Sequence, residues 1–421
     1  EVAKKVAAFY EQIRTILDWK EEHLMRRAAI IRKLKRKFFD LELNNFSGIE
    51  NASESLIFEL IRGGHFPNDK IEESKIHDVQ KIINKYVFIL KNNPESKAGK
   101  TGLNFYNWLI EVCACEIEET LAPSIREMAL IDYMFDAMKE KIKVSDKIYE
   151  GEPSGSLLKK EYTDIQIYIA VCLALFKLDK PIISYNLIKY KYPDWQRADE
   201  QLVSKISENA FKLWQEIESD LTNPLGNKFY SICEKYDTPY LLMGDILSVN
   251  SAAETGKEIP EPSVLESLIK DAYSKRLSTL KSRISRAAIY STISIFVTKV
   301  LSLLLLEVLI EKALGNELNM AILAADVLIP TLLMFIIVVG IKRPSKKNLN
   351  LVTMETMKIV YKKEKADTYE VKMSKKKGFV MKMVLSLVYV ASAFITFGAI
   401  YYALNYFSFP ITSIVIDIIF I

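Results

Sequence analysis

The stretch AAIYSTISIFVTKVLSLLLLEVLI, residues 287–310, decides the fold class of this chain. An α-helix needs roughly 20 mostly apolar residues to cross a hydrocarbon core about 30 Å thick, and this stretch is long enough. Residues 320–341 and 379–404 are apolar over a similar length. The sequence therefore predicts an integral membrane protein with spans at about 287–310, 320–341 and 379–404.

A fourth apolar segment, residues 407–421, is too short as it stands to cross a bilayer. Pro410 near its start is compatible with the first turn of a helix. We interpret this segment as a truncated span in preference to a re-entrant piece. The C-terminal block is thus expected to hold about four spans.

The flanks of the spans predict their orientation. The loop at residues 342–377 carries twelve Lys and Arg against four Asp and Glu, and basic residues also precede the first span. Loops rich in Lys and Arg stay on the cytoplasmic side. Aromatic rings favour the membrane interface, and the third span ends on the outer side with Tyr401, Tyr402 and Tyr406. We therefore expect a multi-pass protein of the cell (plasma) membrane whose long N-terminal region is cytoplasmic.

The N-terminal region shows apolar residues at helical spacing and no sustained strand-like alternation, so the predicted class is all-α. Polar and turn-forming stretches at 145–156 and 250–262 mark boundaries. Ser263 and Glu266 form a capping-box pattern, and no helix breaker separates them from the first span. The predicted plan is a helical domain at 1–144 with a first helix from about Val2 to Leu43, a second helical domain at 157–249, a helical stalk at 263–286 and a transmembrane domain at 287–421.

Cysteine and histidine usage favours neither disulfides nor metal. The four cysteines are too few and too scattered for a disulfide framework, and we expect them to be reduced and buried. The three histidines show no spacing that places two of them on one helix face, so we predict no metal site. These residues are Cys113, Cys115, Cys172 and Cys233, and His23, His65 and His77.

A degenerate phosphate-loop pattern ends in Gly99, Lys100 and Thr101. Pro94 occupies the place of the first glycine, whose backbone freedom lets such a loop wrap its N–H groups around phosphate. No parallel sheet is expected to hold the loop. We therefore favour a solvated connection between helices and predict no cofactor, with a nucleotide-dependent enzyme as a remote alternative.

Charged clusters in the N-terminal region are expected to be surface features. Before residue 287 the chain has 42 Lys and Arg against 44 Asp and Glu, a balance that argues against nucleic-acid binding. The acidic residues Glu116, Glu118 and Glu119 are interpreted as an exposed helix face. Solvated or lipid-facing surfaces are expected for the basic residues Arg26, Arg27, Arg32, Lys33, Lys35, Arg36 and Lys37, and for residues 189–192 with Trp195.

Three charges lie inside the predicted spans: Lys299, Asp326 and Asp417. At about 1.5 Å per residue, Lys299 lies near the midplane and Asp326 at a comparable depth. Each charge alone costs about 2.5–3.5 kcal/mol on insertion scales, so the lysine and a carboxylate should pair. An ion or proton path and a structural pair that fixes helix register are both compatible with this cluster.

The predicted function is a membrane-anchored scaffold or interaction protein that presents a helical cytoplasmic region. Its expected partners are the lipid bilayer and proteins on the cytoplasmic side, and self-association stays open. The alternative is a subunit of a transporter, channel or secretion complex that uses the intramembrane charges. The chain lacks a nucleophile-elbow pattern, so we lean away from an enzyme.

Overall fold

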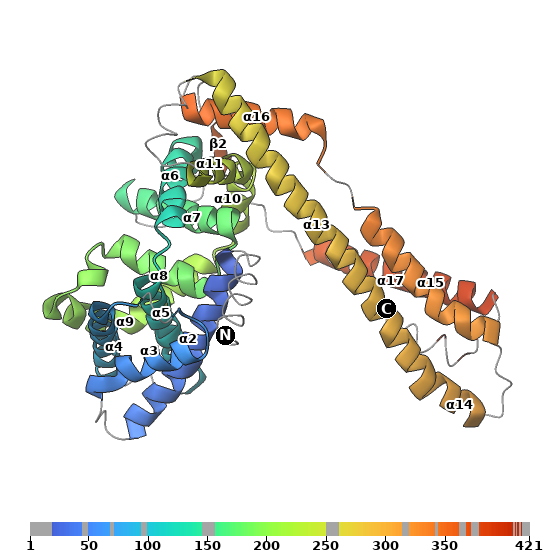
Figure 1. The fold of residues 1–421 in the computed structure, drawn as a ribbon, viewed down its shortest axis with the longest axis horizontal. Coiled ribbons are helices and arrows are strands. Elements are labelled where there is room, and N and C mark those ends of the chain that lie inside the picture. The colour runs from blue at the N-terminus through green and yellow to red at the C-terminus, as the bar shows by residue number, and fades with distance from the viewer. Residues whose placement is uncertain are drawn as a thin grey trace, which may run out of the picture. The chain divides into compact units, whose positions relative to one another are not determined.

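A computed structural model describes residues 19–43, 49–67, 71–93, 99–144, 156–249, 261–313, 320–341, 344–361, 368–371 and 379–406, with single positions beyond. Its chain forms two compact units (Figure 1). Unit 1 comprises Glu1–Asp245 and Lys363–Met373, and unit 2 comprises Ile246–Lys362 and Ser374–Ile421. The described part is all-helical apart from two short strands, which agrees with the predicted class.

Unit 1 is a helical bundle. Its helices are α2 (Trp19–Leu43), η1 (Ile49–Asn51), α3 (Ala52–Arg62), α4 (Glu73–Lys91), α5 (Gly99–Leu121), α6 (Ile125–Lys141), α7 (Ser156–Phe176), α8 (Lys180–Lys191), η4 (Trp195–Arg197), α9 (Glu200–Leu221), α10 (Gly226–Cys233) and, as far as Asp245, α11 (Asp237–Val249).

Helix α5 lies in the core of unit 1. It packs against α2, α4, α8 and α9, and its residues from Val112 to Glu118 are all buried. A helix that is apolar on every side is typically buried, and this part of α5 is nearly so. The predicted first helix is described only from Trp19, because residues 1–18 lie outside the described part.

Two short strands connect the two sequence segments of unit 1. β1 (Ile142–Val144) pairs in parallel with β2 (Tyr369–Val371), so that Ile142 lies opposite Tyr369. Strand β2 lies beside α10 (Figure 1), and the hydroxyl groups of Tyr369 and Tyr236 are 2.9 Å apart. The predicted basic loop 342–377 thus contains a strand of unit 1. The sequence did not predict this strand, because three residues are too few to show a strand pattern.

Helices on both sides of residues 145–155 pack together within unit 1, since α6 contacts α7. Residues 145–155 themselves lie outside the described part. The proposed division into separate domains at 1–144 and 157–249 stays a prediction.

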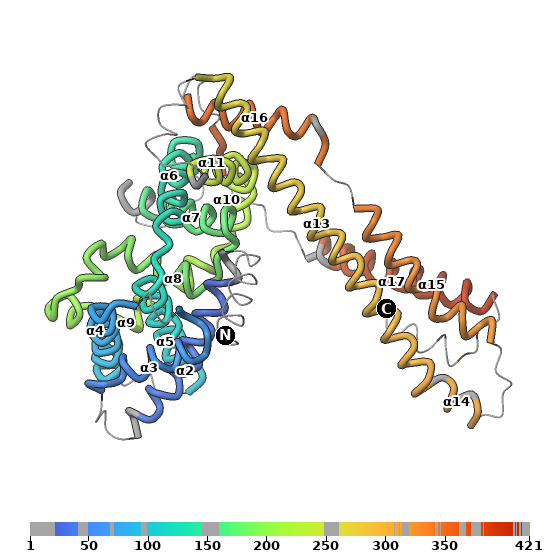
Figure 2. The backbone as a smooth tube through the Cα atoms, in the orientation of Figure 1, coloured from blue at the N-terminus to red at the C-terminus, as the bar shows by residue number. Residues whose placement is uncertain are grey.

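Unit 2 is built on one long helix, α13 (Pro262–Ser302), which runs without a break into the first apolar segment (Figure 2). This continuity is what the absence of a helix breaker predicted. The predicted capping box was wrong, because Glu261 is the N-cap residue, Ser263 donates to Glu261, and Glu266 pairs with Lys270. The other helices are η5 (Leu303–Glu307), α14 (Val308–Ala313), α15 (Met320–Val339), α16 (Lys346–Tyr361) and α17 (Phe379–Tyr406).

Three described helices are long and apolar enough to cross a membrane: Pro262–Ile310, Met320–Val339 and Met383–Tyr406. Their outer surfaces carry large exposed apolar side chains, among them Leu305, Ile336 and Phe394. Apolar surface of this extent is typical of contact with lipid or with other membrane segments. The fourth expected span, 407–421, lies almost wholly outside the described residues.

Helix α16 packs on the stalk part of α13. Asn348 Nδ2 donates to Tyr273 Oη over 3.0 Å, and Thr353 and Thr356 are buried. Tyr273 precedes the predicted span by about 20 Å at 1.5 Å per residue. A span that begins at residue 287, as predicted, would leave the contact between Tyr273 and Asn348 outside the hydrocarbon core.

All four cysteines are free and buried, as the sequence predicted. Burial raises the pKa of Cys115 and of Cys233 to about 12. We expect maleimide at pH 8 to label the folded chain very slowly, because only about one thiol in 10,000 is then a thiolate, against roughly a quarter in an unfolded chain. Quantitative mass spectrometry with and without denaturant checks this, and rapid labelling of any native thiol would contradict it.

Candidate functional site

The ion pair between Lys299 and Asp326 joins two of the apolar helices. Lys299 lies on α13 and Asp326 on α15, which packs along it. The ammonium Nζ is 3.2 Å from Oδ2 and 3.4 Å from Oδ1 of the carboxylate. Lys299 is 6% exposed and Asp326 2% exposed. The structure thus places together the lysine and the carboxylate that similar depth suggested as partners.

Both helices depart from regular α-helical geometry beside this pair. The π-helical turn Leu303–Glu307 begins one residue after Ser302, whose buried hydroxyl has no hydrogen-bond partner among the described residues. On α15, Pro330 lies one turn after Asp326 and cannot donate the helical hydrogen bond toward that turn. Such irregularities often mark functional sites in helices. The pair therefore has polar groups and altered backbone near it.

The third predicted member of the charge cluster, Asp417, lies outside the described residues. The same holds for the side chains of Glu307 and Lys382. Of the predicted cluster, only Lys299 and Asp326 can be placed.

The phosphate-loop residues lie at the start of α5. Gly99 is the first residue of the helix and has a φ of +67°, which glycine adopts without strain. Lys100 and Thr101 are exposed, and residues 94–98 lie outside the described part. The preceding element is helix α4, whereas a phosphate loop follows a strand. Nucleotide binding here stays a remote prediction.

The interpretation of the acidic residues on α5 as an exposed face was wrong. Glu116 is 1% exposed, and its Oε1 accepts a hydrogen bond of 2.6 Å from Lys85 Nζ. Its Oε2 accepts from Tyr86 Oη at 2.8 Å and from Trp195 Nε1 at 3.0 Å. Burial raises the pKa of the Glu116 carboxyl, while Lys85 and these hydrogen bonds oppose the shift. Every oxygen of this buried carboxylate therefore has a partner.

Glu119 links the same helix to α8 and η4. Its carboxylate accepts hydrogen bonds from Tyr185 Oη at 2.6 Å, Lys189 Nζ at 2.7 Å and Gln196 Nε2 at 2.8 Å. Trp195 is fully buried. The prediction of a solvated surface is therefore wrong for Lys189 and Trp195, which form hydrogen bonds with Glu119 and Glu116 of α5.

The basic residues of α2 likewise divide into two groups. Arg26 and Arg27 are buried, where Arg27 pairs with Asp179 and Arg26 with Glu22. His23 Nδ1 lies 2.6 Å from Glu118 Oε1. The predicted solvated surface is wrong for Arg26 and Arg27, whereas Arg32, Lys35 and Arg36 are exposed.

Sequence reasoning missed the buried carboxylates, but a signal for them existed. Glu116 has Cys113, Ala114, Cys115 and Ile117 as neighbours, and all of these are buried. A charged residue inside a helical stretch that is apolar on all faces cannot reach water and must be paired. A cavity of about 1220 Å³ between α4, α5 and α9 is lined partly by Glu116 and Glu119, with basic and acidic side chains in equal number.

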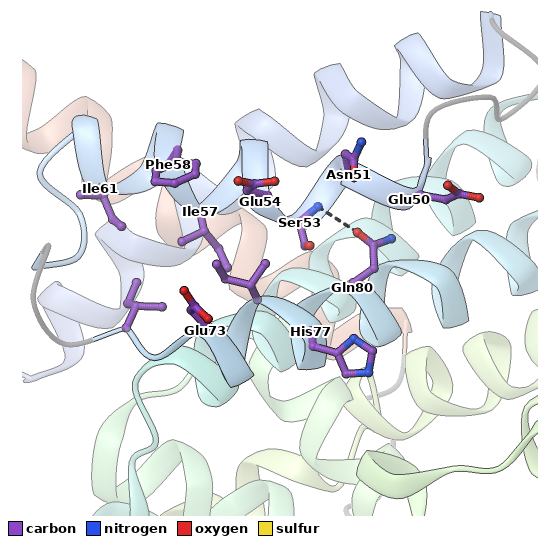
Figure 3. Close-up of a pocket in the computed structure, with 12 residues that line it drawn as sticks. Glu50, Asn51, Ser53, Glu54, Ile57, Phe58, Ile61, Glu73, His77 and Gln80 are labelled. Atoms are coloured by element: carbon purple, nitrogen blue, oxygen red, sulfur yellow. Dashed lines mark hydrogen bonds between the residues drawn. The ribbon is translucent and has the colours of Figure 1, made fainter.

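A smaller groove of about 570 Å³ opens between α3 and α4 (Figure 3). We call it the acidic groove, because three carboxylates, Glu50, Glu54 and Glu73, line it, and His77 is its one other titratable lining residue. Ser53 N donates to Gln80 Oε1 over 3.1 Å and holds the two sides together at one end. Its apolar lining residues are Ile57, Phe58, Ile61, Ile71 and Ile76.

Among the described residues, no cluster of three or more His, Cys, Asp or Glu could hold a metal ion. No protein-family model, curated protein or solved structure matches this chain. The Lys299–Asp326 pair of unit 2 and the acidic groove of unit 1 are the two candidate functional features.

Replacing Lys299 with Leu should destabilise the bundle of unit 2, because Asp326 is then buried without its ammonium partner. The expected loss is about 2.5–3.5 kcal/mol on insertion scales. The double variant Lys299→Leu/Asp326→Leu should recover much of this loss, since neither charge is left alone. Unfolding in mixed micelles measures both, with exposed Lys281→Leu as the control. An unchanged midpoint for Lys299→Leu would show that the pair does not stabilise the bundle.

Proposed function

We propose that this chain is a membrane-anchored interaction protein, in which unit 1 docks a protein partner and the apolar helices of unit 2 fix it to the bilayer. The observation that carries the proposal is the contrast between the two units. Unit 1 buries its apolar side chains in a helical core and leaves an open groove, whereas the helices of unit 2 leave large apolar side chains exposed. We attribute the exposed apolar side chains of unit 2 to contact with lipid, and the open groove of unit 1 to contact with a protein partner.

We place unit 1 and the loop between the second and third spans on the cytoplasmic side of the cell membrane. The pairing of β1 with β2 supports a common side for both, since strands that share hydrogen bonds cannot be separated by a bilayer. Two apolar helices, α13 and α15, lie between these strands in the chain, and two crossings return the chain to its starting side. The excess of Lys and Arg in residues 342–377 favours the cytoplasmic side for both.

A second candidate function is a subunit of a transporter, channel or secretion complex, and the buried pair favours it. Ionisable residues within membrane helices are functional by default. If the pair lies on a proton path, proteoliposomes containing the chain should dissipate an imposed pH gradient, and Asp326→Asn should lose most of this flux. Lys281→Leu should retain it. Flux no faster than in empty liposomes would remove this candidate.

Cross-linking in intact cells tests the first proposal. A membrane-permeant amine-reactive cross-linker should couple lysines of unit 1, such as exposed Lys81, Lys205 and Lys212, to another protein. A sulfonated reagent that cannot cross the membrane should not do so. Mass spectrometry of the purified adducts reads out both. Equal coupling by the two reagents would place unit 1 outside, and coupling only within the chain would contradict an interaction role.

A further inference from the structure

We propose that the acidic groove binds a cationic amphipathic helix of a partner protein. This inference rests on the proposed interaction function and names the surface and the chemistry of the partner. The groove belongs entirely to unit 1, between η1 and α3 on one side and α4 on the other (Figure 3). Its volume is about 570 Å³.

The apolar lining of the groove supplies the contact surface. Ile57 is buried between the helices, and Ile61, Ile71 and Ile76 are partly exposed beside it. Phe58 is 48% exposed, an arrangement that leaves an aromatic side chain unused by the core of unit 1. Apolar side chains repeated at one face of a helix fit such a groove, as in other helix-in-groove complexes.

The charges of the groove favour a partner that carries positive charge. Glu50, Glu54 and Glu73 are exposed and form no ion pair with any described residue. The neighbouring Glu59 differs, because Lys33 and Lys37 pair with it. Within the described part of the chain, no Lys or Arg lines the groove. Three uncompensated carboxylates attract Lys and Arg, and they repel anionic lipid headgroups and nucleic acid.

The geometry favours a helix over an extended strand. An extended peptide binds by adding to an open sheet edge, which requires free backbone N–H and C=O groups. The walls of the groove are mainly the helices α3 and α4, which offer no open sheet edge, and Ser53 N in the first turn of α3 already donates to Gln80. Side chains alone therefore make the contact, and a partner helix presents its apolar residues at i, i+3, i+4 and i+7 to them.

Peptide binding to the full chain in nanodiscs of zwitterionic lipid tests the proposal. The probe is a fluorescent peptide with leucines along one helical face and lysines elsewhere, and its counterpart carries glutamate in place of lysine. We expect saturable binding of the lysine peptide by fluorescence anisotropy, weakening as salt is raised. The glutamate peptide should not bind.

Groove variants identify the binding surface. Glu54→Lys combined with Glu73→Lys should weaken the Kd for the lysine peptide about tenfold or more and allow the glutamate peptide to bind. Phe58→Ser should weaken the Kd for the lysine peptide. The matched controls are Glu208→Lys, at an exposed carboxylate on α9, and Phe88→Ser, at an exposed aromatic outside the groove. They should bind as the unaltered chain does.

Three results would overturn the proposal: no binding of the lysine peptide, equal binding to groove and control variants, or displacement by millimolar Mg²⁺ without any effect of Phe58→Ser, which would indicate a cation site. Because the glutamate peptide gains binding only if the reversed variant folds, this gain separates altered recognition from unfolding. The cellular cross-linking experiment does not depend on the peptide. Cross-links to a partner without peptide binding would therefore refute the groove and leave the interaction function standing.

Discussion

The hydrocarbon core of a bilayer offers no partner to a backbone N–H, a carbonyl or a charge, and this constraint governs unit 2 in the membrane-anchored arrangement that we propose. A single segment that crosses the core by itself must be a helix, because only a helix satisfies its backbone groups within the segment. The same constraint explains why Lys299 of α13 and Asp326 of α15 face each other and are buried. A charge pair of this kind fixes which faces of the two helices meet, since any other rotation leaves both charges in lipid.

The cost of burying an unpaired charge also constrains the core of unit 1. Its buried charges lie between helices distant in the sequence: Lys85 of α4 with Glu116 of α5, and Arg27 of α2 with Asp179 before α8. Such pairs add little net stability relative to apolar side chains, but a buried charge without its partner is costly. We therefore interpret them as constraints on register, while the apolar residues around them supply the driving force of folding.

The parts that local pattern determines were predictable, and the parts that depend on distant partners were not. Apolar length predicted three long apolar helices, the absence of a helix breaker predicted that the stalk continues into the first of them, and the rise per residue suggested Lys299 and Asp326 as partners. Glu116 looked like a surface residue because its partners Lys85 and Trp195 lie far from it in the sequence. The strands β1 and β2 are three residues each, and they can be identified only by their pairing with each other, which joins residues more than 200 positions apart. Grooves between helices leave no periodic signal at all.

The β1–β2 ladder also has a consequence for biosynthesis. Unit 1 cannot be completed when its first helices leave the ribosome, because β2 is translated only after α13 and α15. Until then, β1 presents unpaired backbone groups of the kind that invite wrong pairing. An insertion error that left residues 363–373 on the opposite side of the membrane would keep β1 permanently without its strand. If α13 and α15 insert as proposed, the completion of unit 1 depends on their correct insertion, because only then do β1 and β2 lie on the same side of the bilayer.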